Sequence, residues 1–176
     1  AGVIWGGTGA VADSENWNGS SWSASGNLNT ARYTTAALGI QTAAMAAAGY
    51  IDPATANQSE TYNGTAWTSG NNVQTARQGL AGAGTTTAAI IFGGNSGLSA
   101  SETYDGTSWA TTNSLNTGRS SATGTGDSVP VAMTWGGDNP SWAGIANTEK
   151  YDGTCWAEVA DLATARGDGQ EAGTGK

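Results

Sequence analysis

The chain repeats one short segment four times, and this repetition restricts its fold more than any other feature of the sequence. The four copies are SENWNGSSW at 14–22, SETYNGTAW at 59–67, SETYDGTSW at 101–109 and TEKYDGTCW at 148–156. A second motif, Leu/Val-x-Thr-x-Arg, follows each copy and ends at Arg32, Arg77, Arg119 and Arg166. A repeat of about 42 to 47 residues is typical of a solenoid or a propeller.

Each repeat has room for four short strands and almost none for a helix. In the clearest copy we expect strands at 79–85, 87–92, 101–104 and 107–112, with Gly93-Gly94 closing the second. An Asp-Gly or Asn-Gly pair separates the third and fourth strands, which predicts a two-residue hairpin turn. These pairs are Asn18-Gly19, Asn63-Gly64, Asp105-Gly106 and Asp152-Gly153.

These residues resemble the kelch motif, in which a strand ending in Gly-Gly is followed by Glu-x-Tyr-Asp, a Trp and then an Arg. The third copy keeps every element in order, namely Gly93-Gly94, Glu102, Tyr104, Asp105, Trp109 and Arg119. In the earlier copies Tyr50 replaces the second Gly, Trp17 replaces the Tyr, and Asn18 and Asn63 replace the Asp. The resemblance implies an all-β, four-bladed, kelch-like β-propeller with four-stranded antiparallel blades.

The two ends of the chain continue the repeat in phase. We therefore expect one domain over 1–176, with units at about 33–77, 78–119 and 120–166, and with 167–176 plus 1–32 as the closing blade. Pairing of residues 169–175 with residues 2–6 would close the ring and remove its free sheet edges. A segment of a longer tandem array would have the same phase, so the pattern is compatible with both.

Composition excludes several classes of partner. Leu, Ile, Val and Phe are as scarce as in disordered chains, but eight Trp and five Tyr supply apolar surface instead. The formal net charge is −8, and four of the six basic residues belong to the repeat. A nucleic-acid partner is therefore not expected. No apolar run approaches the ~20 residues that cross a bilayer, so membrane insertion is not expected either.

Residues that recur in every unit are expected to be structural. They are Glu15, Glu60, Glu102 and Glu149, the four motif arginines Arg32, Arg77, Arg119 and Arg166, and the tryptophans Trp22, Trp67, Trp109 and Trp156. We expect each Arg to contact a Glu or loop carbonyls, because its planar fork of donors satisfies several acceptors at once. We expect each Trp to pack between blades. The functional alternatives are a ring of anion sites and a set of stacking platforms for sugars.

The connections between the second and third strands differ between repeats, so they are the candidates for binding. They span 8–13, 51–58, 95–100 and 138–146, and in a propeller equivalent loops emerge on one face. The fourth is the longest and combines an aromatic platform with polar groups. Our candidate ligand-binding residues are Asp138, Asn139, Trp142, Tyr50, Asp52 and Asn95. The alternative is a solvated loop whose Trp folds back over the blade.

The sequence gives little support for catalysis. It contains no His, so neither a Ser-His-Asp nor a Cys-His arrangement is possible. Cys155 occupies the position of Ser21, Ala66 and Ser108, which predicts a small packing residue. Kelch-like propellers of the galactose oxidase family hold copper through His, Tyr and Cys, and this chain cannot supply that set. No catalytic residue, metal site or cofactor is predicted.

We therefore expect a binding module that is not an enzyme. The Thr, Ser, Asn and Gly richness is similar to that of propeller segments in environmental bacterial and phage surface proteins. This similarity suggests an extracellular or virion surface protein that attaches to a glycan or to another protein. The alternatives are a purely structural disc in a larger assembly and, more distantly, a glycan-active enzyme.

Overall fold

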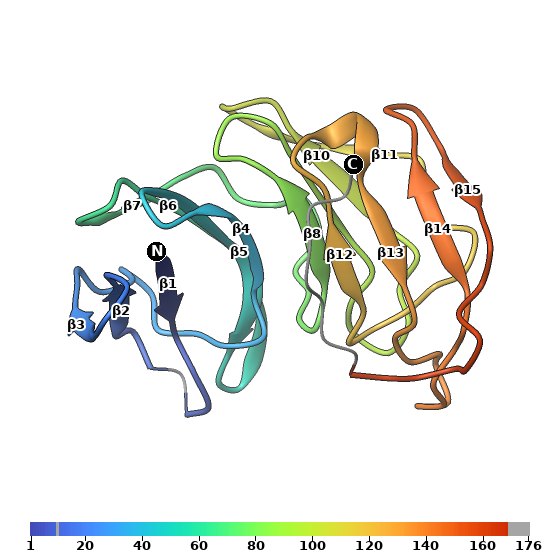
Figure 1. The fold of residues 1–176 in the computed structure, drawn as a ribbon, viewed down its shortest axis with the longest axis horizontal. Helices are drawn as coiled ribbons and strands as arrows, with labels where there is room; N and C mark the ends of the chain where they lie inside the picture. Colours follow the sequence, from blue (N-terminus) through green and yellow to red (C-terminus); the bar gives the residue numbers. More distant parts are fainter. Residues whose placement is uncertain (10, 169–176) are drawn as a thin grey trace.

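Four antiparallel β-sheets follow one another along the chain (Figure 1). The computed structural model describes residues 1–9 and 11–168. Within these residues the only helical segment is a single 3-10 turn, η1 (Val129–Val131). The prediction of an all-β chain built from antiparallel sheets is confirmed.

Each sheet is formed by strands that are consecutive in the sequence. The first sheet contains β1 (Gly2–Trp5), β2 (Ser14–Trp17) and β3 (Trp22–Ala24). The second contains β4 (Ala36–Ile40), β5 (Ala43–Ile51), β6 (Ala54–Tyr62) and β7 (Trp67–Ser69). The third contains β8 (Ala81–Gly84), β9 (Ala89–Phe92), β10 (Ser101–Tyr104) and β11 (Trp109–Thr112). The fourth contains β12 (Thr123–Thr125), β13 (Met133–Trp135), β14 (Thr148–Tyr151) and β15 (Trp156–Glu158).

The first sheet has three described strands where the others have four. Its β1 corresponds to the second strand of the other sheets, because β1 precedes the Gly6-Gly7 pair as β9 precedes Gly93-Gly94. No described strand therefore occupies the innermost position beside β1. The predicted closing strand, 169–175, lies outside the described residues.

The inner strands β4, β8 and β12 lie side by side, and small residues allow their close approach. A Cβ added at Gly82 of β8 would lie 2.7 Å from Leu38 Cδ2 of β4. A Cβ added at Gly124 of β12 would lie 2.6 Å from Phe92 Cζ. Because real Cβ atoms do not approach other atoms so closely, glycine is required where neighbouring sheets converge.

The Asp-Gly and Asn-Gly turns of the repeat are four residues long, and our prediction of two-residue turns was wrong. In the third sheet, Tyr104 pairs with Trp109, so residues 105–108 form the turn. Asp105 Oδ1 accepts hydrogen bonds of 2.8 Å from the N–H groups of Thr107 and Ser108. The side chain takes the place of a backbone acceptor, which lengthens the favoured turn. Asn18, Asn63 and Asp152 make the same two bonds in their own sheets.

Two other local predictions need correction in the second sheet. The backbone conformation of Gly93-Gly94, with φ of 69° and 107°, recurs at Ala48-Gly49, with φ of 57° and 112°. Ala48 therefore replaces the first Gly, whereas we had expected Tyr50 to replace the second. The expected loop 51–58 is also mostly strand, because β5 and β6 extend to a short turn at Asp52-Pro53.

The core consists of three clusters of buried residues. A Trp of one sheet packs against the sheet before it in each case: Trp5 lies edge-on to Trp67 at a ring distance of 5.0 Å, and Phe92 lies edge-on to Trp156 at 4.7 Å. Trp109 belongs to the cluster that contains Met45 and Ala47 of β5. Aromatic side chains thus supply the inter-sheet surface that aliphatic residues provide in most proteins.

Candidate functional site

Buried Arg–Glu ion pairs join successive units of the repeat. Arg32 Nη2 lies 2.7 Å from Glu60 Oε1, and Arg119 Nη2 lies 2.6 Å from Glu149 Oε1. Arg77 pairs with Glu102 in the same way, and all six side chains are at most 1% exposed. Burial lowers the pKa of Arg32 and of Arg119, and the paired glutamate opposes that shift in each case. These three guanidinium groups are enclosed by protein and offer no surface to a free anion.

The same arrangement supplies carbonyl acceptors for each arginine. Arg119 Nη1 donates to the carbonyls of Gly136 and Asn147, at 3.0 and 2.7 Å. Glu149 in turn accepts hydrogen bonds from the N–H groups of Asn116 and Thr117. Both charged groups are therefore surrounded by partners, as a buried ion pair requires.

The fourth repeat of this pattern differs. Glu15 and Arg166 are both exposed, and Trp22 is 50% exposed, whereas Trp67, Trp109 and Trp156 are buried. Glu15, Trp22 and Arg166 thus match the buried residues of the other units in sequence, but no described neighbouring sheet buries them.

Three of the candidate ligand residues occupy one repeated position. Tyr50, Asn95 and Asp138 each follow the Gly-Gly position, and each backbone N–H donates to the carbonyl of the residue that follows a motif arginine. The acceptors are Tyr33, Gln78 and Ser120, at 2.8, 2.7 and 2.8 Å. Sequence differences at this position therefore place different side chains on the same part of each unit.

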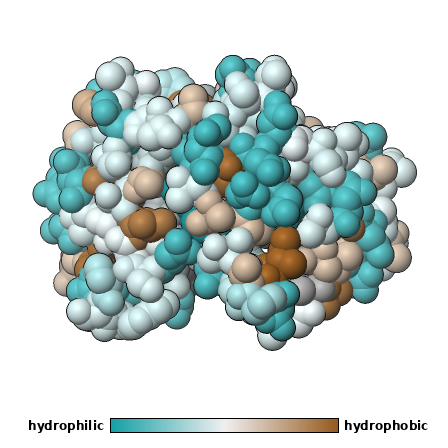
Figure 2. Space-filling view, turned by 180° about the vertical axis from the view of Figure 1, so that it is seen from behind, coloured by the Kyte–Doolittle hydropathy of each residue, from teal (hydrophilic) through white to brown (hydrophobic). Residues whose placement is uncertain are grey.

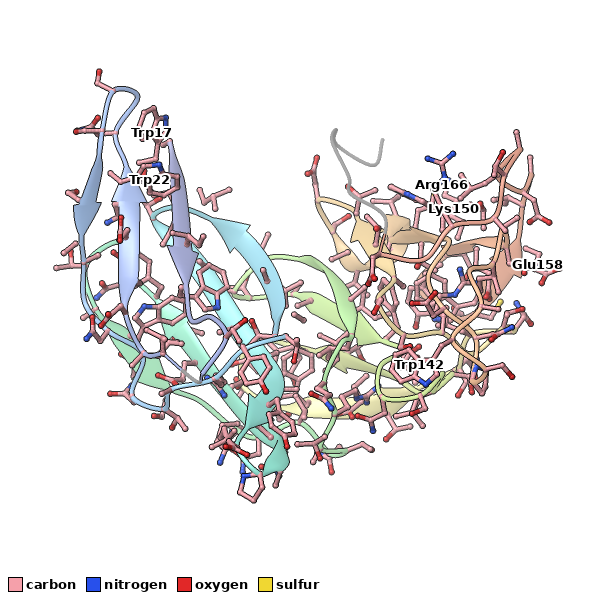
Figure 3. The ribbon with its side chains drawn as sticks, turned by 90° about the horizontal axis from the view of Figure 1, so that it is seen from below. Trp17, Trp22, Trp142, Lys150, Glu158 and Arg166 are labelled. Carbon is pink, nitrogen blue, oxygen red and sulfur yellow. The ribbon has the colours of Figure 1, made fainter. Side chains whose placement is uncertain are left out.

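Asn95 and Trp142 lie together at a hollow of about 420 Å³, which we call the Trp142 hollow. Its lining residues are Thr34, Thr55, Gln78, Gly79, Asn95, Ser96, Ser120, Ser121 and Trp142. All are neutral, and all but Gly79 and Trp142 carry a hydroxyl or an amide. Trp142 is 66% exposed and lies on the loop that follows β13 (Figure 3).

A smaller hollow of about 240 Å³ adjoins it, since both share Thr34, Gly79 and Ser121. Asp168 also lines this smaller hollow. The four residues Thr34, Gly79, Ser121 and Asp168 stand two positions after the motif arginines, and all have φ between 47° and 60°. The repeated backbone turn therefore brings the starts of successive units to one place.

Ser120 has a buried hydroxyl for which the described residues provide no hydrogen-bond partner. This serine is 2% exposed, and it lines the Trp142 hollow. Asn95 Oδ1 is occupied by the N–H of Gln78 at 3.1 Å. A buried polar atom without a partner is costly, and Ser120 is the one described lining residue of this hollow that carries such an atom.

The remaining candidate residues have other surroundings. Asn139 Oδ1 accepts hydrogen bonds from the N–H groups of Ser141 and Ala143, so this amide shapes the loop that carries Trp142. The Tyr50 ring packs edge-on to Tyr33, at 5.3 Å. Asp138 is only 8% exposed, and Asp52 lies at the exposed tip of the β5–β6 hairpin. None of these four candidates lines the Trp142 hollow.

Sequence reasoning missed most of the lining residues. Thr34, Gln78, Ser120 and Ser121 directly follow Arg32, Arg77 and Arg119 or stand one residue further on. These positions vary between repeats although they adjoin the least variable residue of the motif. Variable positions next to an invariant Arg could therefore have identified these lining residues from the sequence.

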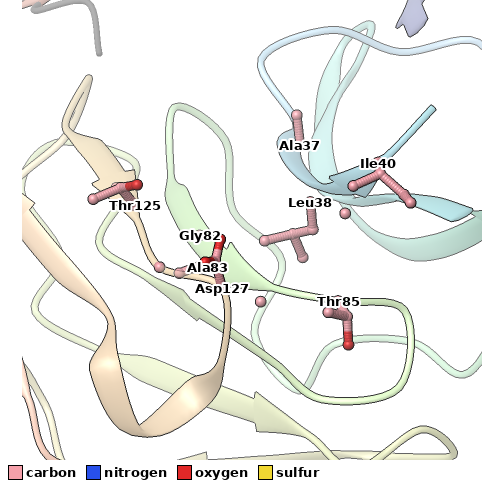
Figure 4. Close-up of a pocket in the computed structure, with 12 residues that line it drawn as sticks. Ala37, Leu38, Ile40, Gly82, Ala83, Thr85, Thr125 and Asp127 are labelled. Carbon is pink, nitrogen blue, oxygen red and sulfur yellow. The ribbon is translucent and has the colours of Figure 1, made fainter. Parts of the chain in front are cut away.

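A third hollow, of about 370 Å³, lies where the ends of the inner strands meet (Figure 4). Its lining consists mainly of Gly and Ala from 37–40, 82–85 and 124–127, and Asp127 is its one ionisable residue. It has few groups that could orient a ligand.

Figure 2 shows the hydrophobic residues of one molecular face as separate patches among neutral and hydrophilic ones.

Metal sites and membrane-spanning helices each need their own residue patterns. In the described part of the chain, no group of three or more His, Cys, Asp or Glu side chains is placed to hold a metal ion. None of the described helical structure has the length and apolar character needed to span a bilayer.

Comparison with protein-family models and with curated proteins finds no match. The kelch assignment therefore remains a resemblance carried by the motif residues.

Proposed function

We propose that this protein is a non-enzymatic surface-binding module that holds a neutral glycan in the Trp142 hollow. Its four sheets would be the blades of a kelch-like propeller. The repeated motif and the side-by-side inner strands β4, β8 and β12 support this arrangement. An inner strand added beside β1 would complete the first blade, and the sequence assigns that strand to residues 169–175, supplied by the same chain or by a second copy.

The observation that carries the proposed function is the combination of an exposed Trp with an uncharged polar lining. Trp142 is the most exposed Trp among the described residues, and its neighbours at the hollow are hydroxyl and amide side chains. The indole face offers a flat apolar surface for the C–H face of a sugar ring. Hydroxyls and amides both donate and accept, as sugar hydroxyls do.

The absence of charge from this lining favours a neutral ligand over an acidic one. Binding residues on loops and turns of a rigid scaffold are a common arrangement, and here the sheets hold those turns in place. A glycan-binding module of this kind suits an extracellular or virion surface, where attachment to a glycan-coated target is needed. Catalysis is not part of the proposed role.

The test is a glycan array followed by calorimetry with the best ligand. Trp142→Ala should weaken binding at least about tenfold, while Trp142→Phe should recover part of the affinity. Trp22→Ala removes a similarly exposed Trp that does not line the hollow, and it should leave binding unchanged. If Trp142→Ala binds as tightly as the unmodified chain, the hollow is not the glycan site.

Ser120→Ala separates binding from stability. It removes a buried hydroxyl that has no partner among the described residues, so the free energy of unfolding should stay equal or rise. Glycan affinity should fall, because the ligand loses a hydrogen bond. Unchanged affinity would exclude Ser120 Oγ as a ligand contact.

The second candidate function is assembly, and the exposed first sheet favours it. Ile4 and Trp22 are 57% and 50% exposed there. Large apolar side chains gathered on one sheet face are typical of interaction surfaces.

A further inference from the structure

One face of the first sheet is exposed where the corresponding face of the other sheets is buried. Strand pairing places Ile4 opposite Glu15, and Trp17 opposite Trp22, on this face. Ile4 is 57% exposed, Trp22 is 50% exposed, and Glu15 is exposed. We call these four residues the leading face.

The equivalent residues of the second sheet show what such a face contacts. Glu60, Tyr62 and Trp67 are 1%, 2% and 6% exposed. Glu60 binds Arg32 of the preceding unit, and Trp67 packs edge-on against Trp5 of the preceding sheet. Trp67 Nε1 also donates to Ser14 Oγ at 3.3 Å. The leading face of a unit therefore binds the trailing side of the unit before it.

The third and fourth sheets repeat these contacts. Trp109 Nε1 donates to Ser59 Oγ, and Trp156 Nε1 donates to Ser101 Oγ, at 3.4 and 3.1 Å. Phe92 takes the role of Trp5 toward Trp156. Three interfaces in one chain thus share an ion pair and an indole N–H to hydroxyl bond, and two of them share an edge-on aromatic contact.

The fourth unit carries the complementary residues on its trailing side. Strand pairing places Trp135 opposite Thr148, as Phe92 is opposite Ser101. Arg166 is exposed, whereas the other three motif arginines are 0% exposed. We call Trp135, Thr148 and Arg166, together with the exposed Lys150 of the same strand as Thr148, the trailing face.

In the described part of the chain, the leading and trailing faces lie apart from each other. Figure 3 shows Trp17 and Trp22 on one side of an opening, and Lys150 and Arg166 on the other. The leading face has the Glu and Trp of the three internal interfaces, and the trailing face has their Arg, aromatic and hydroxyl residues. A chain that carries one half of an interface at each end can join a copy of itself head to tail.

We propose that two copies of this chain associate head to tail through these faces. Arg166 of one copy pairs with Glu15 of the other, and Trp22 packs against Trp135 and donates to the Thr148 hydroxyl. Two such contacts close a ring of eight sheets, which is within the range of about 4 to 8 blades of known propellers. The source of the closing contacts is a second copy, whereas the sequence alone predicted closure within one chain.

The test uses charge reversal and analytical ultracentrifugation over a range of concentrations. The unmodified chain should form a dimer as concentration rises. Glu15→Arg and Arg166→Glu should each raise the dimer dissociation constant at least about tenfold, because like charges then meet at both contacts. Asp52→Arg is the matched control, since it reverses an exposed charge at the tip of the β5–β6 hairpin, on neither face, and should leave the dimer intact.

Mixing the two single variants distinguishes a second copy from closure within one chain. In a mixed dimer, the two reversed side chains meet each other at one contact and the native pair forms at the other, so dimers should reappear. If the mixture stays monomeric while a chain with both reversals regains the thermal stability of the unmodified protein, closure is within the chain and the proposal is wrong. A chain that is monomeric at every concentration, and whose stability neither reversal changes, also overturns it.

Dimer formation and glycan binding are separate measurements. Trp142→Ala should dimerise normally, since Trp142 is on neither face. The two proposals can therefore fail independently.

Discussion

Nη2 of Arg119 lies 2.6 Å from Oε1 of Glu149, and neither side chain has any exposed surface. The arginine ends the unit at 78–119, and the glutamate lies in β14 of the unit at 120–166, so the pair joins two successive units. Two further pairs repeat this link in the second and third sheets. Ion pairs thus recur at the same point of successive units in a chain with few aliphatic residues.

Glu149→Gln should destabilise the protein by about 3 to 5 kcal/mol, because it leaves the buried Arg119 charge without its partner. Urea denaturation followed by Trp fluorescence measures the change. Glu15→Gln is the matched control: at dilute chain concentration, removing this exposed equivalent should change stability by less than about 0.5 kcal/mol. Equal losses in the two variants would show that burial does not set the strength of the pair.

Ser101→Ala should cost about 1 to 3 kcal/mol, because the buried indole N–H of Trp156 loses its acceptor. Trp156→Ala should cost about 3 to 5 kcal/mol through the cavity that it leaves. Trp22→Ala, measured in dilute solution, should cost much less, since half of that side chain is already in water. A large loss for Trp22→Ala in a monomeric sample would contradict this exposure.

Asp105 and Asp152 should make stability fall at acidic pH. The N–H groups of Ser108 and Thr107 lower the pKa of Asp105, and those of Cys155 and Thr154 lower the pKa of Asp152. A carboxyl whose pKa is lower in the folded state stabilises the fold above its unfolded value of about 4. That contribution is lost as pH falls through the folded pKa.

The double variant Asp105→Asn, Asp152→Asn should therefore weaken the dependence of stability on pH below about 4. Asn18 and Asn63 make the same turn bonds in their own sheets, so the variant should keep the fold. Denaturation midpoints between about pH 2 and pH 7 provide the measurement. An unchanged slope in the variant would mean that these turns do not contribute to acid sensitivity.

Cys155 should react slowly with alkylating reagents at neutral pH despite being exposed. The negative charge of Asp152 raises the pKa of this thiol, which reduces the reactive thiolate. Asp152→Asn should accelerate alkylation by iodoacetamide, followed by mass spectrometry at about pH 7 to 8. The same rate in both proteins would exclude Asp152 as the cause.

Local sequence patterns predicted the positions of the strands well. The strand expected at 101–104 is β10, and those expected at 79–85, 87–92 and 107–112 contain β8, β9 and β11. Alternating side chains and glycine punctuation act over a few residues, so they can be read without the fold. The turn length was missed because it depends on where a side-chain oxygen such as Asp105 Oδ1 binds.

The Trp142 hollow could not be predicted in the same way. The loop positions of Trp142 and Asn95 mark them as candidates, but Thr34 and Thr55 come from a third unit and reach the hollow through the arrangement of the sheets. Similarly, the motif suggests that Arg119 contacts a Glu, while the partner, Glu149, is set by packing.

The amino-acid sequence by itself determined that this protein is a repeated all-β structure with Gly-containing turns and aromatic anchors. Those properties arise from backbone preferences and from a period that every unit repeats. The tertiary structure alone decided which copies of a repeated residue are buried. Trp67 and Trp22 have the same place in the motif, but only Trp67 has a sheet in front of it, because burial depends on neighbours that are distant in the chain.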